Sequence, residues 1–201
     1  MKTLLAATCR ILLVRHATAL GNGSFQGQRD VALAAAGHRE LSALCEKCSR
    51  YPVRAVYASD LLRARQTAGA VAQQFGLQVE ARPEFREMHF GEWEGLTWKQ
   101  VSLRSPKLAK TWLERFPFQP APGGETLARF RRRIGGAIGK VIATHHGECA
   151  LVVTHAGVIR FVLGSVLGLP AHNVFRLVQD PCAINVVDYL EDGAIVRCIN
   201  G

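Results

Sequence analysis

The sequence has no apolar run long enough to cross a membrane. A membrane-spanning helix needs about 18 or more consecutive apolar residues, and every apolar stretch of this 201-residue chain is shorter. The N-terminal segment contains only a short apolar piece before Arg10, and no clear small-residue cleavage site follows it. We therefore expect a cytoplasmic protein with no membrane partner.

Patterns typical of metal ligation are also missing. Six cysteines are scattered along the chain, and Cys45 and Cys48 form a lone CxxC inside a helical pattern. Without a second pair, this spacing favours reduced thiols packed on helix and strand faces over a metal or redox site. No cluster of carboxylates suited to Mg²⁺ is visible. We expect a chemistry that uses no metal and no other cofactor.

Acidic residues are outnumbered by basic ones, 16 against 25, which gives a formal charge of +9. The excess indicates an anionic partner, and charge alone does not choose among phosphate, nucleic acid and an acidic membrane surface. The basic run Arg129–Arg133 resembles a nucleic-acid patch, but on a helix its arginines spread around the axis and no aromatic platform is interleaved. We expect a solvated helix face there, with one arginine supporting the excursion at 97–124, and no nucleic-acid partner.

What the chain does contain is an alternation of strand-like and helical patterns. Strands are expected at 10–14, 53–59, 77–82 and 149–157, with a final hairpin over 183–200 that turns at Asp192-Gly193. Helices are expected at 36–49, 61–76, 125–146 and 158–168. This order predicts an α/β fold with a mainly parallel sheet covered on both faces, to which the hairpin adds an antiparallel strand.

The stretch 97–124 differs from the rest of the chain, because it is rich in proline, aromatic and basic residues and has no strand pattern. We expect one domain over 1–201, with this stretch as an excursion, or cap, over the sheet edge. Large aromatic side chains surround it, and burial in a core of the excursion is favoured over contact with a substrate. They are Trp93, Trp98, Trp112, Phe116 and Phe118.

Two predicted strands end in the same way, in "ILLVRHAT" and "ALVVTHAG". Ligands of open α/β sheets bind at the carboxyl ends of the strands. If the two strands are neighbours, His16 and His155 point into one crevice. A histidine pair in matching positions, one member preceded by Arg15, indicates a functional site.

Charged residues near the other strand ends suit phosphoryl transfer. Arg63 lies in the first turn of a predicted helix, where the dipole favours anions, so a bound anion explains an arginine there. Neutral His16 is then the nucleophile that forms a phosphohistidine, while the arginines and the second histidine bind the phosphoryl oxygens. Glu87, which follows the third strand, is the candidate that protonates the leaving alkoxide.

At these residues the chain resembles the histidine phosphatase superfamily, the phosphoglycerate mutase-like proteins. The hallmark Arg-His-Gly is present as "RHA", with Ala17 in place of the usual glycine. Four more blocks follow in family order: "SDLLRARQTA" at 59–68, "FREMHFGEWEG" at 85–95, "PGGETLARFRRR" at 122–133 and "HHGECALVVTHAGVIR" at 145–160. Together the blocks cover nearly the whole chain.

The resemblance implies a three-layer α/β/α sandwich with a mainly parallel six-stranded sheet and one antiparallel strand. It also implies catalytic roles for His16, Glu87, Arg15, Arg63 and His155, and substrate contacts from Arg15, Arg63, His155, Asn22, Gln28 and Ala156. Within the family, "FQGQRDVALAAAG" and "EMHFGEWEGLTWKQV" are similar to segments of the α-ribazole phosphatases. The implied function is a metal-independent phosphatase for a small metabolite, α-ribazole 5′-phosphate of cobalamin lower-loop synthesis.

Three alternatives stay open. One is a phosphoglycerate mutase-type phosphotransferase, although the short insertion after the glutamate block favours a phosphatase. A sugar-bisphosphate phosphatase of the same family is the second. The third is a non-catalytic phosphate- or nucleic-acid-binding protein, which the complete set of catalytic residue types disfavours. The sequence does not determine the oligomeric state, and a dimer is one option.

Overall fold

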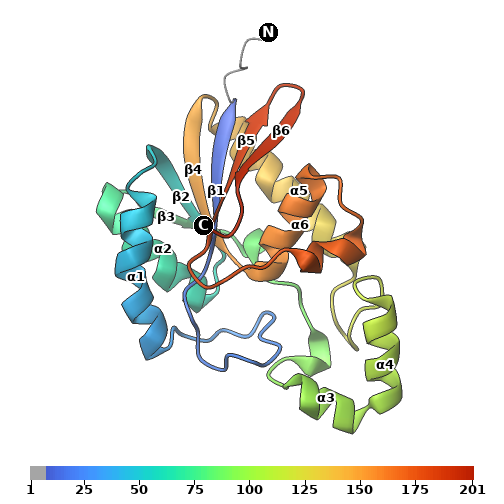
Figure 1. The fold of residues 1–201 in the computed structure, drawn as a ribbon. Coiled ribbons are helices and arrows are strands. Elements are labelled where there is room, and N and C mark those ends of the chain that lie inside the picture. Colours follow the sequence, from blue (N-terminus) through green and yellow to red (C-terminus); the bar gives the residue numbers. More distant parts are fainter. Residues whose placement is uncertain (1–7) are drawn as a thin grey trace.

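The computed structural model describes residues 8–201, so the expectation for the N-terminal residues 1–7 lies outside the described part of the chain. A six-stranded sheet forms its centre (Figure 1). Its strands are β1 (Cys9–Arg15), β2 (Val53–Ala58), β3 (Val79–Ala81), β4 (Glu148–Thr154), β5 (Ile184–Leu190) and β6 (Gly193–Cys198). They are ordered β3-β2-β4-β1-β5-β6, and only β5 runs against its neighbours. The predicted mainly parallel sheet with one antiparallel strand is confirmed.

Helices cover both faces of the sheet and make three layers (Figure 1). One face carries α1 (Ala35–Cys48) and α2 (Leu62–Phe75), and the other carries α5 (Leu127–Thr144) and α6 (Ala156–Val166). Successive side chains of a strand point to opposite faces. In β1, Ile11 and Leu13 accordingly pack with α5 and α6, while the alternate residues Leu12 and Val14 pack with α1 and α2. Among the described residues, no helix combines the length and apolarity needed to span a bilayer.

Several elements are shorter than the sequence predicts, because their ends are used for capping. The predicted strand at 77–82 shrinks to Val79–Ala81, since Gly76 ends α2 with φ +64° and the Leu77 N–H donates to Ala72 of the same helix. Helix α5 begins at Leu127 because the Thr126 hydroxyl accepts from the Arg129 N–H. Strand β4 ends at Thr154, and His155 is the residue from which α6 starts.

The stretch 97–124 folds into two helices, α3 (Trp98–Arg104) and α4 (Pro106–Arg115), beside the sheet (Figure 1). Their aromatic side chains form a separate cluster with Trp93, in which Trp98, Trp112 and Phe116 take part as expected. Phe118 is an exception, because 63% of it is exposed and it does not join the cluster. Phe25 and Phe90 connect this cluster to the cavity described below.

Candidate active site

The two strand-end histidines lie side by side. Strands β1 and β4 are parallel neighbours whose register pairs Arg15 with Thr154, so the next residue of each strand is a histidine at the same edge. The rings of His16 and His155 have centroids 5.1 Å apart at an interplanar angle of 63°. The prediction that these two residues share one crevice is confirmed.

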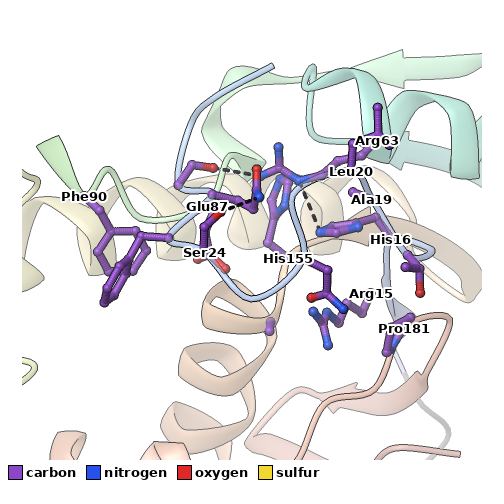
Figure 2. A pocket seen from close by; sticks show the side chains of 16 residues that line it. Arg15, His16, Ala19, Leu20, Ser24, Arg63, Glu87, Phe90, His155 and Pro181 are labelled. Atoms are coloured by element: carbon purple, nitrogen blue, oxygen red, sulfur yellow. Dashed lines mark hydrogen bonds between the residues drawn. The ribbon is translucent and has the colours of Figure 1, made fainter. Parts of the chain in front are cut away.

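Both histidines open on a cavity of about 200 Å³ at the carboxyl ends of the parallel strands (Figure 2). All five predicted catalytic residues line it, and the loop after β1 supplies most of the rest of its wall. The lining residues are Arg15, His16, Thr18, Ala19, Leu20, Asn22, Ser24, Phe25, Gln26, Gly27, Arg63, Glu87, Phe90, His155, Ala156 and Pro181.

The hydrogen bonds of His16 leave Nε2 as the nitrogen with a lone pair. Its Nδ1 lies 2.8 Å from the Ala17 carbonyl oxygen, which can only accept, so the proton is on Nδ1. Its Nε2 accepts from Arg63 Nε at 3.2 Å. Burial, Arg63 and Arg15 lower the pKa of His16 to about 3. The ring is therefore neutral at pH 7, as a nitrogen nucleophile must be.

The guanidinium of Arg63 is held rigidly under the cavity. It is 1% exposed, and its two Nη groups donate to the carbonyls of Arg29 and Gly27, each at 2.7 Å. Within residues 8–201, neither Arg63 nor Arg15 forms an ion pair with a carboxylate. A buried guanidinium with no carboxylate in direct contact is costly unless an anion binds to it.

Three buried nitrogen atoms at the cavity have no partner among the described residues. They are Nε of Arg15 and both ring nitrogens of His155. The Arg15 side chain is anchored at its other end, where Nη1 donates to the Gln179 carbonyl at 2.6 Å. Burial, followed by Arg63 and His16, lowers the pKa of His155 well below its ordinary value. The Arg15 Nε–H and the single N–H of a neutral His155 are thus buried donors without a partner among the described residues. Such donors are rare in folded proteins, so they are suited to an oxyanion ligand.

Glu87 lies across the cavity at the N-terminus of α6 (Figure 2). One carboxylate oxygen accepts from the Gly157 N–H at 2.9 Å and the other from the Met88 N–H at 2.8 Å. Gly157 permits this approach, because a Cβ there would lie 2.3 Å from Oε1 of Glu87. The carboxyl group is thus placed by two backbone amides at the wall of the cavity that His16 also lines.

The backbone after His16 accommodates the substitution of alanine for the usual glycine. Ala17 does not adopt a positive φ, so its Cβ introduces no backbone strain. Its N–H donates to the Thr67 hydroxyl at 3.1 Å. The next residue, Thr18, donates from its N–H and its hydroxyl to the two carboxylate oxygens of Glu40, at 2.8 and 2.7 Å.

The additional substrate-binding candidates differ in their positions. Asn22 and Ala156 line the cavity, and Asn22 is exposed at its mouth. Gln28 lies outside the lining, because its side-chain amide donates to the Glu87 carbonyl at 3.1 Å. The neighbouring Gln26, which the sequence does not single out, lines the cavity instead and presents a buried Oε1 without a partner among the described residues.

The residues that hold Glu87 in place also escape prediction from the sequence. The basic run is expected to form a solvated helix face with one arginine supporting the excursion. In the structure the guanidinium of Arg133 turns inward and donates to the carbonyls of Glu84, Arg86 and Glu87. Arg133 also forms an ion pair with Glu125, at 2.7 Å. Backbone carbonyls have no sequence signature, so only the spacing of eight residues between Glu125 and Arg133 could have indicated this arrangement.

The comparisons with known proteins agree with this geometry. The family model described as "Histidine phosphatase superfamily (branch 1)" matches residues 11–201. A "Bifunctional protein" of Mycobacterium tuberculosis is 32% identical over 195 residues, which are 95% of this chain and 53% of that protein. The chain thus spans about half the length of the curated relatives of this kind. A Yersinia enterocolitica protein named "Probable phosphoglycerate mutase GpmB" is 30% identical, over 90% of this chain and 86% of its own.

Solved structures with the same fold include two phosphatases. The α-ribazole phosphatase of Shigella flexneri superposes with a TM-score of 0.85 at 25% identity, covering 96% of each chain. A mycobacterial glucosyl-3-phosphoglycerate phosphatase superposes with a TM-score of 0.85 at 24% identity, covering 96% of this chain and 98% of its own.

Proposed function

Because the chain belongs to the histidine phosphatase superfamily, we propose that it hydrolyses phosphate monoesters through a phosphohistidine on His16, without a metal ion. The observation that carries the proposal is the group of unpartnered buried nitrogens of Arg15 and His155, within the described chain, beside a neutral His16. A tetrahedral oxyanion with a phosphorus atom near Nε2 of His16 supplies the acceptors that these donors lack.

In the first step Nε2 of His16 attacks phosphorus and the bond between phosphorus and the ester oxygen breaks. The Glu87 carboxyl gives its proton to the departing oxygen, which leaves as an alcohol. In the second step a water molecule attacks the phosphohistidine, and Glu87, now a carboxylate, takes the proton of that water. The phosphorus–nitrogen bond breaks, orthophosphate forms, and His16 is again neutral with its Nδ1–H donating to the Ala17 carbonyl.

Charge on the phosphoryl oxygens is balanced by Arg15 and Arg63, and the neutral ring of His155 donates one hydrogen bond to them. Each charge-assisted hydrogen bond contributes about 1.5–3 kcal/mol. The planar guanidinium groups suit three oxygens that spread apart as phosphorus passes through its trigonal arrangement. Their fixed anchors on the carbonyls of Gln179, Arg29 and Gly27 mean that little reorganisation accompanies the reaction.

The substrate that we propose is α-ribazole 5′-phosphate. The similarity to the Shigella flexneri α-ribazole phosphatase and the "EMHFGEWEG" block support this choice. Phe25 and Phe90 form an aromatic wall of the cavity, with ring centroids 5.1 Å apart, against which a planar base can pack.

A phosphoglycerate mutase activity is the second candidate, because the Yersinia enterocolitica relative carries that name. A mutase returns the phosphoryl group to a second hydroxyl and needs a bisphosphate primer. Isomerisation of 3-phosphoglycerate that depends on added 2,3-bisphosphoglycerate supports the mutase, and its absence supports the phosphatase.

The first experiment is phosphate release from α-ribazole 5′-phosphate, 3-phosphoglycerate, fructose 2,6-bisphosphate, phosphoserine and p-nitrophenyl phosphate, with EDTA present. His16→Ala is the control, and rapid quench followed by alkaline work-up detects the acid-labile phosphohistidine. Activity that survives in His16→Ala contradicts the mechanism. Activity that needs His16 but does not favour α-ribazole 5′-phosphate keeps the mechanism and overturns the substrate.

Two further features belong to the same proposal. We expect the chain to act as a single domain in which 97–124 caps the active site, which predicts one cooperative unfolding transition. We also expect a cytoplasmic location, which cell fractionation checks.

A further inference from the structure

The segment that bears the proposed general acid is unusual in how its backbone is held. Residues Glu84, Phe85, Arg86 and Glu87, here called the acid-bearing segment, belong to a turn and loop between β3 and α3. All four of their carbonyl oxygens accept hydrogen bonds from side chains of residues distant in sequence. A loop whose carbonyls are satisfied by water would not fix a side chain in this way.

Arg133 makes most of these contacts. Its Nη1 donates to the carbonyls of Glu84 and Arg86 at 2.7 and 2.8 Å, and its Nη2 lies 3.3 Å from the carbonyl of Glu87. Thr154 supplies the contact to Phe85 at 2.7 Å, and Gln28 also reaches the Glu87 carbonyl. Arg133 alone therefore joins three of the four residues of the segment to helix α5.

Glu125 orients the Arg133 guanidinium toward the acid-bearing segment. Its two carboxylate oxygens accept from Nε and Nη2 of Arg133 at 3.1 and 2.7 Å, in the bidentate geometry that fixes the plane of a guanidinium. The side chains of Arg133 and Glu125 are 19% and 11% exposed. The pair is thus mostly buried and bidentate, and the remaining donors of Arg133 all reach one loop, so the pair is organised to position that loop.

We propose that Arg133, oriented by Glu125, is a positioning residue that sets the place of the Glu87 carboxyl group and on which proton transfer to the leaving oxygen depends. This inference rests on the proposed function, because it assigns Glu87 the role of acid. Arg133 touches only the backbone of the segment and has no contact with the cavity. Its substitution should therefore leave phosphate binding and the attack by His16 in place.

The test compares an ester that needs the acid with one that does not. Glycerol 3-phosphate has an alkoxide leaving group that must be protonated, whereas p-nitrophenolate leaves without a proton. A general acid contributes about 10²–10⁴-fold. For Arg133→Met we expect kcat on glycerol 3-phosphate to fall about 10²-fold, in line with a misplacement of about 1 Å. We expect the KM for this ester, and kcat/KM for p-nitrophenyl phosphate, to change by less than about threefold, because kcat/KM reports the steps up to departure of the leaving group and not the later hydrolysis in which Glu87 is the base.

The neighbouring Arg132 provides the matched control. It is exposed on the same helix and makes no side-chain hydrogen bond among the described residues, so Arg132→Met removes the same charge without touching the segment. We expect wild-type constants on both esters. Glu125→Gln is the second variant. It leaves the hydrogen bonds of Arg133 to the carbonyls in place but weakens the bidentate contact that orients the guanidinium. It should lower the hydrolysis of glycerol 3-phosphate less than Arg133→Met does, and again leave that of p-nitrophenyl phosphate nearly unchanged.

A double-mutant cycle separates positioning of Glu87 from any other effect of Arg133, including its electrostatic influence on His155. In a Glu87→Gln background the acid is already absent, so Arg133→Met should then cause no further loss on glycerol 3-phosphate. A further loss of tenfold or more, or an equal loss on both esters in the single variant, overturns the inference. Hydrolysis of p-nitrophenyl phosphate that survives in His16→Ala overturns the proposed function instead. If Arg133→Met does not fold, Glu125→Gln decides the question by the same cycle.

Discussion

Gly157→Ala adds a single methyl group beside the proposed acid, and we expect it to impair catalysis strongly. Gly157 is the second residue of α6, and its N–H donates to the Glu87 carboxylate. A Cβ at this position would lie 2.3 Å from Oε1 and 3.0 Å from Cδ of Glu87. Since carbon and oxygen atoms in contact need about 3.5 Å, the carboxyl group of Glu87 must retreat by about 1 Å in Gly157→Ala.

The magnitude follows from the role of the displaced group. A shift of about 1 Å in a catalytic group costs about 10²-fold, which lies at the low end of what a general acid contributes. We therefore expect kcat/KM for glycerol 3-phosphate to fall about 10²-fold and that for p-nitrophenyl phosphate by less than about threefold. Alanine is favoured over glycine within helices by about 1 kcal/mol, so the variant should not unfold for lack of helix stability.

The control for this experiment is Gly69→Ala in α2. It makes the same chemical change in a helix, but a Cβ at Gly69 meets no atom of the described chain within 4 Å. It should keep wild-type activity on both esters. Wild-type hydrolysis of glycerol 3-phosphate by Gly157→Ala would refute the assignment of Glu87 as the acid in this geometry, and so would an equal loss on the two esters.

Three further predictions concern binding, pH and the excursion. Orthophosphate should stabilise the wild-type protein by about 2.7 kcal/mol at 100 times its Kd, measured as a shift in thermal unfolding, and the shift should vanish in Arg63→Met, which lacks the buried guanidinium. The pKa of His16 is lowered from 6.5 to about 3 in the folded state, so the unfolded chain takes up this proton first. The free energy of unfolding should therefore be highest above pH 6.5 and fall below it by about 1.4 kcal/mol per pH unit for this group. Urea unfolding between pH 7 and 4 should show a shallower fall for His16→Asn, and equal slopes contradict the buried, neutral imidazole. Trp112 is 8% exposed in the aromatic cluster of the excursion, so Trp112→Ala should lower the free energy of unfolding by about 3–5 kcal/mol. Phe118 is exposed, so Phe118→Ala should change the free energy of unfolding by less than about 0.5 kcal/mol.

The excess of positive charge has a local explanation at the active site. Arg63 is buried and Arg15 is half-buried at the cavity, both without carboxylate partners in the described chain, and Arg160 is half-buried one turn beyond Ala156 in α6. Arg160 is anchored by a hydrogen bond from Nε to the Leu177 carbonyl at 2.9 Å. The charge that the sequence shows as a net sum is therefore concentrated, in part, where a phosphate dianion is expected to bind.

Much of the fold follows from the sequence because its signals are local. Strand β1 leads into His16 and β4 into His155, and the continuous apolar runs of both strands mark them as central and buried. Because ligands bind at the carboxyl ends of parallel strands, the two histidines are expected at one edge of the sheet from their sequence positions alone. Arg63 and Glu87 follow from the same reasoning, because each lies shortly after a strand.

The tertiary structure alone decided the features that depend on backbone carbonyls and on the paths of loops. Gln26 rather than Gln28 faces the cavity, because the loop after β1 directs the side-chain amide of Gln28 toward the Glu87 carbonyl. Arg133 in the "RFRRR" run looks like its neighbours in sequence, yet only its guanidinium reaches three carbonyls of a loop more than 40 residues away. A carbonyl oxygen is present at every residue, so the sequence carries no mark of which ones converge on a side chain. Periodicity and strand-end chemistry therefore determined where the site lies, and the packing of distant segments determined how its acid is held.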